Sequence, residues 1–227
     1  MGHEYIRSHR AYWQLAVYLS KAGFHVLRFD FYGCGDSSGD VEQGEIRQWL
    51  SDISTAIDEI RGISGCAKVC LVGLRLGGAL SMMVGAERGD IEGMVLWDAV
   101  ANGSAYLEEL TTTHQETFRY FHAKSKHHIT GEKPAEVLGF PLTDFMRRDL
   151  AKLDLLTIQK KPANNILLIE SNEAAAAGQL KAHLKSLDPH LAYQHLPGPQ
   201  IWIADVNKVL MPIQILQAVV SWISEVY

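Results

Sequence analysis

Short apolar runs alternate with amphipathic helical patterns along most of this chain, and that alternation predicts a parallel β-sheet with crossover helices. Several runs are almost continuously apolar, as expected for strands buried on both faces. A length of 227 residues suits one well-buried domain and is short for two, so we expect a single α/β domain over residues 1–227. The predicted strands are His25–Phe31, Lys68–Leu74, Ile91–Trp97, Asn165–Glu170 and Leu191–His195.

Apolar residues recur with the 3.6-residue period of a helix between these strands. The pattern predicts helices at about Ser8–Ala22, from Ile46 to Gly62, from the Gly73–Gly78 turn to about Glu87, and from Pro212 onward. Residues 101–160 interrupt the alternation with a stretch too long for a connecting loop. We expect this stretch to be a helical lid over the carboxyl edge of the sheet.

One specific motif runs from a strand through a glycine-flanked turn into a helix, in the order Val69-Cys-Leu-Val-Gly73-Leu-Arg75-Leu-Gly77-Gly78. This is the layout of the nucleophile elbow G-x-S-x-G, whose glycines relieve crowding around one residue at a sharp turn. The residue at the nucleophile position is Arg75. A guanidinium cannot be deprotonated, and losing a triad nucleophile costs roughly a millionfold in turnover, so serine chemistry is not expected here.

A second motif, Asp30-Phe-Tyr-Gly33-Cys34-Gly35-Asp-Ser-Ser-Gly39, directly follows a predicted strand. Its glycines permit a tight loop at the carboxyl end of that strand, where parallel α/β sheets bind their ligands. We therefore expect Gly33 and Cys34 to line a ligand pocket.

Together the two motifs resemble those of α/β-hydrolases of the serine aminopeptidase-like group, and the resemblance covers nearly the whole chain. More narrowly, three stretches of the sequence are similar to those of hydrolase-like proteins associated with exosortase and exopolysaccharide gene clusters. They are Gly2-His-Glu-Tyr-Ile-Arg-Ser-His-Arg, Gly-Leu-Arg75-Leu-Gly and Val-Leu-Trp-Asp98. The resemblance implies an α/β-hydrolase-type, mostly parallel sheet with flanking helices and a helical lid. The family's N-terminal strands, one of them central and beside Val26–Phe31, have no counterpart, so either the chain is shortened or its sheet closes differently.

Carrying the family's triad onto this sequence gives an incomplete set. The acid corresponds to Glu170 or Glu173 after the strand that follows the lid, or to Asp98 after the preceding strand. The family's histidine belongs in the loop after the last strand, but residues 197–212 contain none. His195 lies just before that loop, at the end of the strand.

The resemblance also implies two oxyanion-type donors and a pocket lining. One donor is the backbone amide of Leu76, directly after the elbow residue, and the other comes from the start of the chain at Gly2. His3 beside it and Trp202, in the loop after the last predicted strand, are the remaining expected pocket residues.

Arg75 is expected at the positive end of a helix dipole, which is an unfavourable place for a cation. It therefore needs an anion, for which Asp98 is the first intramolecular candidate and Glu170 the second. A bound carboxylate or phosphate is the functional alternative. Arg75 is thus either half of a structural ion pair or an anion-binding residue of a ligand pocket.

Three functions are compatible with these residues. The first is a degenerate, non-serine hydrolase that binds a small anionic or acyl-type ligand or acts as an accessory protein in envelope polysaccharide or exosortase-linked biology. The second is an active ester or amide hydrolase with relocated catalytic residues, namely Cys34, His195 and either Asp98 or Glu170. The third is a non-catalytic scaffold that binds a partner protein through the lid face, Tyr106–His128.

Composition excludes several other classes. A net charge of −5 and a pI near 6.0 provide no basic surface for nucleic acid. The apolar runs have the length of strands, so we expect no membrane span. The first residues do not have the pattern of a signal peptide, and the three cysteines are consistent with reduced thiols, so we expect a cytoplasmic protein. No second Cys/His pair accompanies Cys66 and Cys70, so no metal and no cofactor are expected. The oligomeric state is not determined by the sequence.

Overall fold

The computed structural model describes residues 2–122, 136–172, 175–188, 190–203 and 210–227. Its centre is a four-stranded sheet in which every neighbouring pair is parallel, with the order β1-β2-β5-β6. The predicted α/β class is confirmed, and four of the five predicted strands are present. They are β1 (Cys70–Leu74), β2 (Gly93–Trp97), β5 (Asn165–Glu170) and β6 (Ala192–His195).

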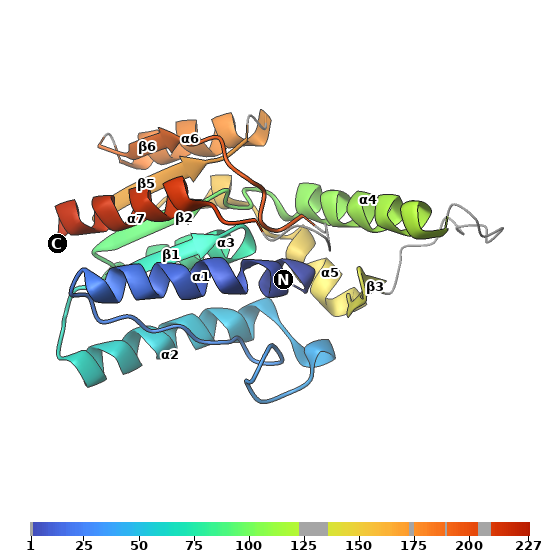
Figure 1. Ribbon diagram of the computed structural model, residues 1–227, viewed down its shortest axis with the longest axis horizontal. Coiled ribbons are helices and arrows are strands. Elements are labelled where there is room, and N and C mark those ends of the chain that lie inside the picture. Colours follow the sequence, from blue (N-terminus) through green and yellow to red (C-terminus); the bar gives the residue numbers. More distant parts are fainter. Residues whose placement is uncertain (1, 123–135, 173–174, 189, 204–209) are drawn as a thin grey trace.

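Helices cover both faces of this sheet (Figure 1). On one face, α1 (His3–Lys21) and α7 (Ile213–Val226) pack side by side over an apolar cluster that includes Val95 and Trp97. On the other face, α2 (Ile46–Ser64), α3 (Leu76–Arg88) and α6 (Ala175–Leu187) enclose a second cluster that includes Met94 and Leu96. Successive residues of β2 thus enter opposite clusters, as the two-residue period of a strand requires.

The first helix begins earlier than expected. It starts at His3, after Gly2 with a φ of 53°, and the predicted cap Ser8 lies inside it with its hydroxyl donating to the carbonyl of Tyr5. The reason is that the buried stripe of α1 extends back through Ser8 to Glu4, so the helical period continues to the start of the described chain. The second helix ends at Ser64, two residues beyond the predicted end, and Gly65 caps it with a left-handed φ of 72°.

The predicted strand His25–Phe31 is wrong. These residues run between α1 and α2 without pairing to any strand of the described chain, and Val26, Leu27 and Phe29 are 38%, 41% and 41% exposed. The segment has the apolar pattern of a strand, but a strand also needs a neighbour for its backbone groups. The free edge of β1 is not paired with this segment, so the pattern alone did not produce a strand.

The segment between β2 and β5 contains α4 (Gly103–His122), α5 (Asp144–Ala151) and the 3₁₀ turn η2 (Leu155–Thr157). Its expected helical character is modified by a short antiparallel pair, β3 (Glu136–Val137) with β4 (Phe140–Pro141). α4 projects away from the body of the molecule (Figure 1). None of the helices within the described residues is long and apolar enough to cross a membrane.

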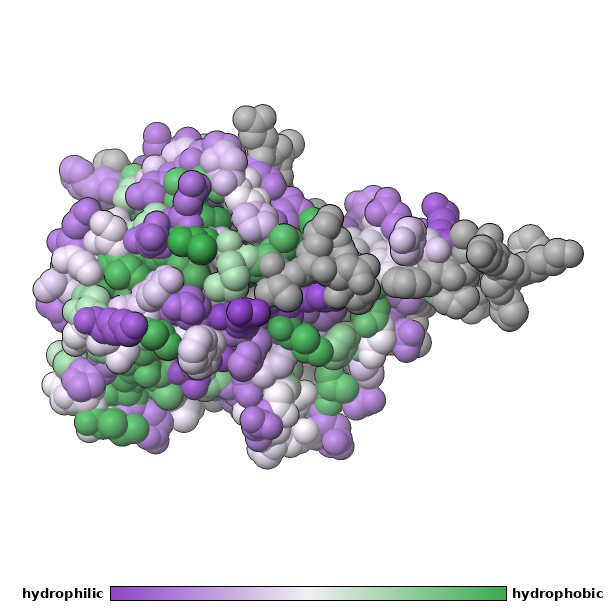
Figure 2. Space-filling view, in the orientation of Figure 1, coloured by the Kyte–Doolittle hydropathy of each residue, from purple (hydrophilic) through white to green (hydrophobic). Residues whose placement is uncertain are grey.

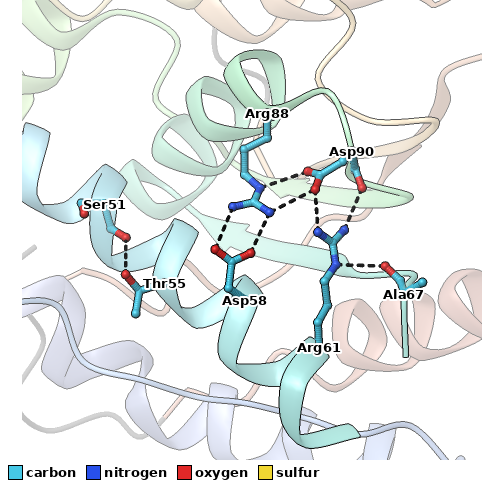
Figure 3. Close-up of polar contacts among 7 residues, drawn as sticks. All are labelled: Ser51, Thr55, Asp58, Arg61, Ala67, Arg88 and Asp90. Atoms are coloured by element: carbon cyan, nitrogen blue, oxygen red, sulfur yellow. Dashed lines mark hydrogen bonds and ion pairs between the residues drawn. The ribbon is translucent and has the colours of Figure 1, made fainter. Parts of the chain in front are cut away.

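A charged network joins α2, α3 and the segment before β2, as Figure 3 shows. Arg88 pairs with Asp58 at 2.8 Å and with Asp90 at 3.0 Å, and Arg61 also pairs with Asp90. The hydrogen bonds from Arg88 and Arg61 lower the pKa of Asp90 to about 2. Because Asp90 precedes β2, this network lies at the amino edge of the sheet, opposite the edge that carries the elbow.

Candidate active site

The strand–turn–helix elbow is confirmed at the carboxyl end of β1. Arg75 stands between β1 and α3 with a φ of 53°, a left-handed conformation that is costly for a residue other than glycine. The turn is held by backbone bonds, since the Arg75 amide donates to Trp97 at 3.0 Å and its carbonyl accepts from Val100 at 3.2 Å. A Cβ on Gly73 would lie 2.5 Å from the Cα of Gly78, so the close strand–helix approach requires glycine there.

The strand register places four of the predicted site residues in one row across the carboxyl edge. Leu74 is level with Trp97, Trp97 with Ile169, and Glu170 with His195. Arg75, Asp98, Glu170 and His195 are therefore the residues at the carboxyl ends of the four strands, in sheet order. With strands spaced about 4.8 Å apart, Arg75 and His195 are separated by three spacings, or about 14 Å of backbone.

Arg75 is neutralised by carboxylates from two helices. Its Nε lies 3.3 Å from Oε1 of Glu4 in α1, and one terminal nitrogen lies 2.5 Å from Oε2 of Glu109 in α4. The prediction that Asp98, or failing that Glu170, pairs with Arg75 is wrong, since neither carboxylate forms an ion pair with it. The two glutamates reach Arg75 because α1 begins, and α4 passes, beside the carboxyl edge of the sheet.

Two aromatic rings flank the same guanidinium. The ring of Tyr106 lies 5.4 Å from the guanidinium carbon and the ring of Trp202 lies 5.0 Å from it. Both rings are almost fully buried, so the cation–π attraction acts on a largely desolvated charge. The Trp202 ring therefore packs against Arg75 at the elbow.

The charges of this cluster are strongly coupled. Burial tends to raise the pKa of Glu4, but the positive charge of the amino terminus, then that of Arg75, and a hydrogen bond donated by the Tyr106 hydroxyl lower it on balance. Burial works against the Arg75 cation, yet Glu4 and Glu109 raise its pKa. Burial and the charge of Glu4 raise the pKa of the Tyr106 hydroxyl well above its usual value. Glu4 and Arg75 are therefore both charged near neutral pH.

Asp98 is engaged by a different residue. Its carboxylate accepts from the backbone amide of Ser171 at 2.9 Å and from the Ser171 hydroxyl at 2.6 Å. Burial raises the pKa of Asp98, and the Ser171 hydrogen bonds oppose that rise. Asp98 has a φ of 42°, so it too ends its strand in a left-handed turn. It orients no imidazole within the described residues.

Glu170 and His195 lie side by side at the far end of the row. Glu170 is 7% exposed, and its Oε2 accepts from the hydroxyl of Tyr193 at 2.9 Å. Its Oε1 is buried without a hydrogen-bond partner in the part of the chain that the structure describes. The His195 side chain is exposed. Glu173, the other possible acid, lies outside the described residues.

Comparison with known proteins supplies the family. The family model described as serine aminopeptidase, S33, matches residues 2–219. The chain belongs to this family of α/β-hydrolases. A search of curated proteins found no significant match.

Several esterases with solved structures share the fold of this S33 family member. The ferulic acid complex of Est1E from Butyrivibrio proteoclasticus is 18% identical over 93% of this chain and 80% of its own, with a TM-score of 0.65. An esterase from Pyrococcus furiosus is 16% identical over 95% of this chain and 75% of its own, with a TM-score of 0.59. Mouse alpha/beta hydrolase domain-containing protein 10 is 16% identical over 94% of this chain and 84% of its own, with a TM-score of 0.59. At these identities the likeness concerns the fold.

Of the two predicted oxyanion-type donors, Leu76 and Gly2, one has the expected position beside Arg75 and the other does not. The amide of Leu76 is the first of α3 and donates to no backbone carbonyl among the described residues, as is normal for a helix start. Gly2 precedes α1, and its carbonyl accepts from the amide of Tyr5 at 3.1 Å. Leu76 thus has the position expected of a donor, whereas no contact links the Gly2 amide to Arg75.

The other predicted pocket residues do not assemble a catalytic pair. Burial raises the pKa of the Cys34 thiol, which disfavours the thiolate that a nucleophile needs, and no hydrogen bond joins Cys34 to a histidine among the described residues. Burial lowers the pKa of His3 to about 4, so this imidazole is neutral at pH 7. Gly33 shapes the turn after residue 31, because a Cβ there would lie 2.5 Å from the carbonyl oxygen of Asp40.

Sequence reasoning missed the residues that surround Arg75, namely Glu4, Tyr106 and Glu109. One signal was available for Glu4, because it continues the buried stripe of α1 by one more turn beyond Ser8. A carboxylate on the apolar stripe of a helix requires a buried partner. No comparable signal marked Glu109, whose side chain is 48% exposed on a helix that was read as a lid.

Proposed function

We propose that this S33 family member lacks serine hydrolase chemistry and binds a small molecule bearing a carboxylate or acyl group at the carboxyl edge of its sheet. The observation that carries this proposal is the placement of Arg75, a permanent cation, at the elbow with one buried and one exposed counter-ion. The cation takes the place of the attacking group and is suited to hold an anion instead.

The two counter-ions differ in how easily they can be replaced. Glu4 is 5% exposed and also accepts the Tyr106 hydroxyl, so a ligand can replace it less easily than Glu109. Glu109 is half exposed, and an exposed ion pair contributes only about 0–1 kcal/mol. A ligand carboxylate can therefore take the place of Glu109 on the guanidinium, while Trp202 provides a flat apolar wall beside it.

The arrangement also supports the loss of the hydrolytic mechanism. Arg75 cannot attack a carbonyl, Asp98 is occupied by Ser171, and His195 is about three strand spacings away. A fluorophosphonate probe should accordingly leave the protein unlabelled. Labelling of a serine near Arg75 would contradict the proposal, because it would demonstrate an activated hydroxyl at this site.

Ferulic acid is a suitable first ligand, because it joins a carboxylate to an aromatic ring and Est1E has been solved with it bound. We expect calorimetry to detect ferulate binding that Arg75→Gln weakens by roughly 10- to 100-fold, the value of a hydrogen bond to a charged group. Glu109→Gln should strengthen binding, since it removes the competing carboxylate. The matched control is Glu108→Gln, an exposed neighbour on α4, which should leave affinity unchanged. Equal affinity in wild type and Arg75→Gln would contradict the proposed site.

The wider role belongs to the same proposal. The resemblance of Gly2–Arg10 and of the elbow to exosortase- and exopolysaccharide-associated proteins supports an accessory role in that biology, in the cytoplasm. Co-purification with polysaccharide-assembly proteins, or a gene located next to theirs, tests this role.

The alternative of an ester hydrolase with relocated catalytic residues predicts p-nitrophenyl ester turnover that is abolished by Cys34→Ala or His195→Ala. A scaffold acting through the lid face predicts partner binding that is lost when α4 is removed.

A further inference from the structure

The outward face of α1, opposite the sheet, carries large apolar side chains. A step of two residues turns an α-helix by about 200°, so Ile6 and Trp13, each two residues from buried positions, lie opposite the buried stripe. Their exposed fractions, 58% and 52%, agree with this placement. Surface helices normally have polar residues there, so this face is unusual. The buried stripe consists of Glu4, Ser8, Ala11, Leu15 and Leu19.

The neighbouring helix extends this surface. α7 packs beside α1 on the same face of the sheet, and its first residue, Ile213, is 51% exposed. Over the next two turns its exposed residues are Gln214, Gln217 and Ser221, none of which is charged. Figure 2 shows hydrophobic residues among hydrophilic ones on the face where α1 and α7 lie side by side.

Two arginines accompany the exposed apolar residues of α1. Arg7 and Arg10 lie between Ile6 and Trp13 in the chain, each within about one turn of both. Neither arginine forms an ion pair with any described residue, unlike the arginines of the network in Figure 3. Their charges are therefore available to an anionic partner.

Acidic side chains are almost absent from the same surface. Glu4 is the one carboxylate in α1, and it is buried against Arg75. Glu225 is the one carboxylate in α7, and it lies in the last turn, at the same end of the molecule as Lys21 of α1. A chain with a net charge of −5 thus has a local excess of positive charge on its α1 face.

This combination of side chains fits a lipid surface that carries negative charge. Tryptophan favours the boundary between headgroups and acyl chains, and arginine lays its apolar stem along that boundary while its guanidinium reaches the phosphates. Nucleic acid matches the arginines but offers no apolar layer for Ile6 and Trp13. A second copy matches the apolar residues, but a two-fold contact brings the arginines of both copies together.

We propose that the outward face of α1, centred on Ile6, Arg10 and Trp13, docks this protein on the surface of a bilayer that contains anionic lipids. Ile213 of α7 adds to the apolar contact. The helix lies along the surface and does not cross it, since none of the described helices is long and apolar enough to span a membrane. The face points away from the sheet, so the contact is separate from the ligand site at Arg75.

The test uses unilamellar vesicles of equal parts phosphatidylglycerol and phosphatidylcholine, compared with vesicles of phosphatidylcholine alone. We expect sedimentation to show roughly tenfold or more tighter binding to the anionic vesicles, and this difference should fall at high salt. Trp13 reports the contact directly, because it is 52% exposed and the other four tryptophans are 8% exposed or less. Its emission should shift to the blue with anionic vesicles, and Trp13→Phe should abolish the shift.

Substitutions on opposite faces of the molecule locate the contact. Arg10→Gln and Ile6→Gln should each weaken binding to the anionic vesicles by about fivefold. The matched controls are Arg47→Gln and Ile63→Gln on α2, which covers the other face of the sheet. Both control positions are exposed, so these variants should bind as wild type does.

Three results would overturn the proposal. They are no binding to anionic vesicles at low salt, equal binding to the two kinds of vesicle, and equal losses in the α1 variants and their α2 controls. A blue shift that follows protein concentration without vesicles, together with a dimer in sedimentation, would also overturn it and would assign the face to a second copy.

Discussion

Replacing Glu4 with glutamine should destabilise the protein by several kcal/mol. The substitution keeps the shape of the side chain but removes the buried counter-ion of Arg75, whose side chain is only 13% exposed. Removing one partner of a buried ion pair costs about 3–5 kcal/mol. Glutamine still accepts a hydrogen bond and Glu109 still pairs with Arg75. We therefore expect the free energy of unfolding to fall by the lower end of this range, about 3 kcal/mol.

For a chain of this length each kcal/mol shifts Tm by about 2–4 °C, so Glu4→Gln should lower Tm by about 6–12 °C. The matched control is Glu109→Gln, which removes the same charge from the same guanidinium at a half-exposed position. That change should cost about 0–1 kcal/mol. Urea unfolding of both variants, each alone and combined with Arg75→Met, measures the two coupling energies.

The pH dependence of stability follows from the Glu4 carboxylate, whose pKa is lowered by the amino-terminal charge and by Arg75. The pKa of Glu4 is lowered below its usual 4.5 in the folded protein, so its contribution is fully present above that value and is lost as pH falls through the folded pKa. Wild type should therefore lose stability more steeply than Glu4→Gln below about pH 4.5. Equal Tm losses in the Glu4 and Glu109 variants, or parallel acid profiles, would refute the view that Glu4 is the buried anchor of this cluster.

The remaining predictions concern the elbow and the amino edge of the sheet. Arg75→Ser should not produce p-nitrophenyl acetate turnover above background, because among the described residues Asp98 orients no imidazole at the elbow; a measurable kcat would overturn this view. Gly73→Ala should cost about 1–3 kcal/mol in urea unfolding through contact with the helix backbone, whereas Gly77→Ala, with open space around it, should be neutral or slightly stabilising. Asp90→Asn should lower stability by at most about 1 kcal/mol. Because the folded pKa of Asp90 is about 2, that difference should be present at pH 7 and should disappear as pH falls from 3.8 towards 2.

Local patterns were enough for most of the fold. β5 was predicted with its observed bounds, and β1, β2 and β6 within two residues, because apolar runs bounded by turn residues report burial of the nearby chain. The same pattern failed at His25–Phe31. Those residues have the composition of a strand, but whether a strand forms depends on a neighbouring backbone, and the neighbouring position is a cavity.

The site divides in the same way. Glycine spacing around Arg75 was sufficient to place a cation at a strand–helix corner, since it depends on steric crowding within a few residues. The row formed with Asp98, Glu170 and His195 needed only the assumption that parallel strands end at one edge. The distance between the His195 imidazole and the elbow depends on the order of the strands in the sheet, which the tertiary structure alone provides.

The amino-acid order alone therefore establishes that the elbow carries a charge that cannot attack and cannot be titrated away. It does not establish which carboxylates balance that charge, because Glu4 and Glu109 lie 71 and 34 positions from Arg75 in the chain. Their contact depends on how α1 and α4 are turned about their axes where they meet the sheet edge. Coulomb attraction falls with distance through space and is indifferent to separation along the chain, so the folded arrangement selects the partners.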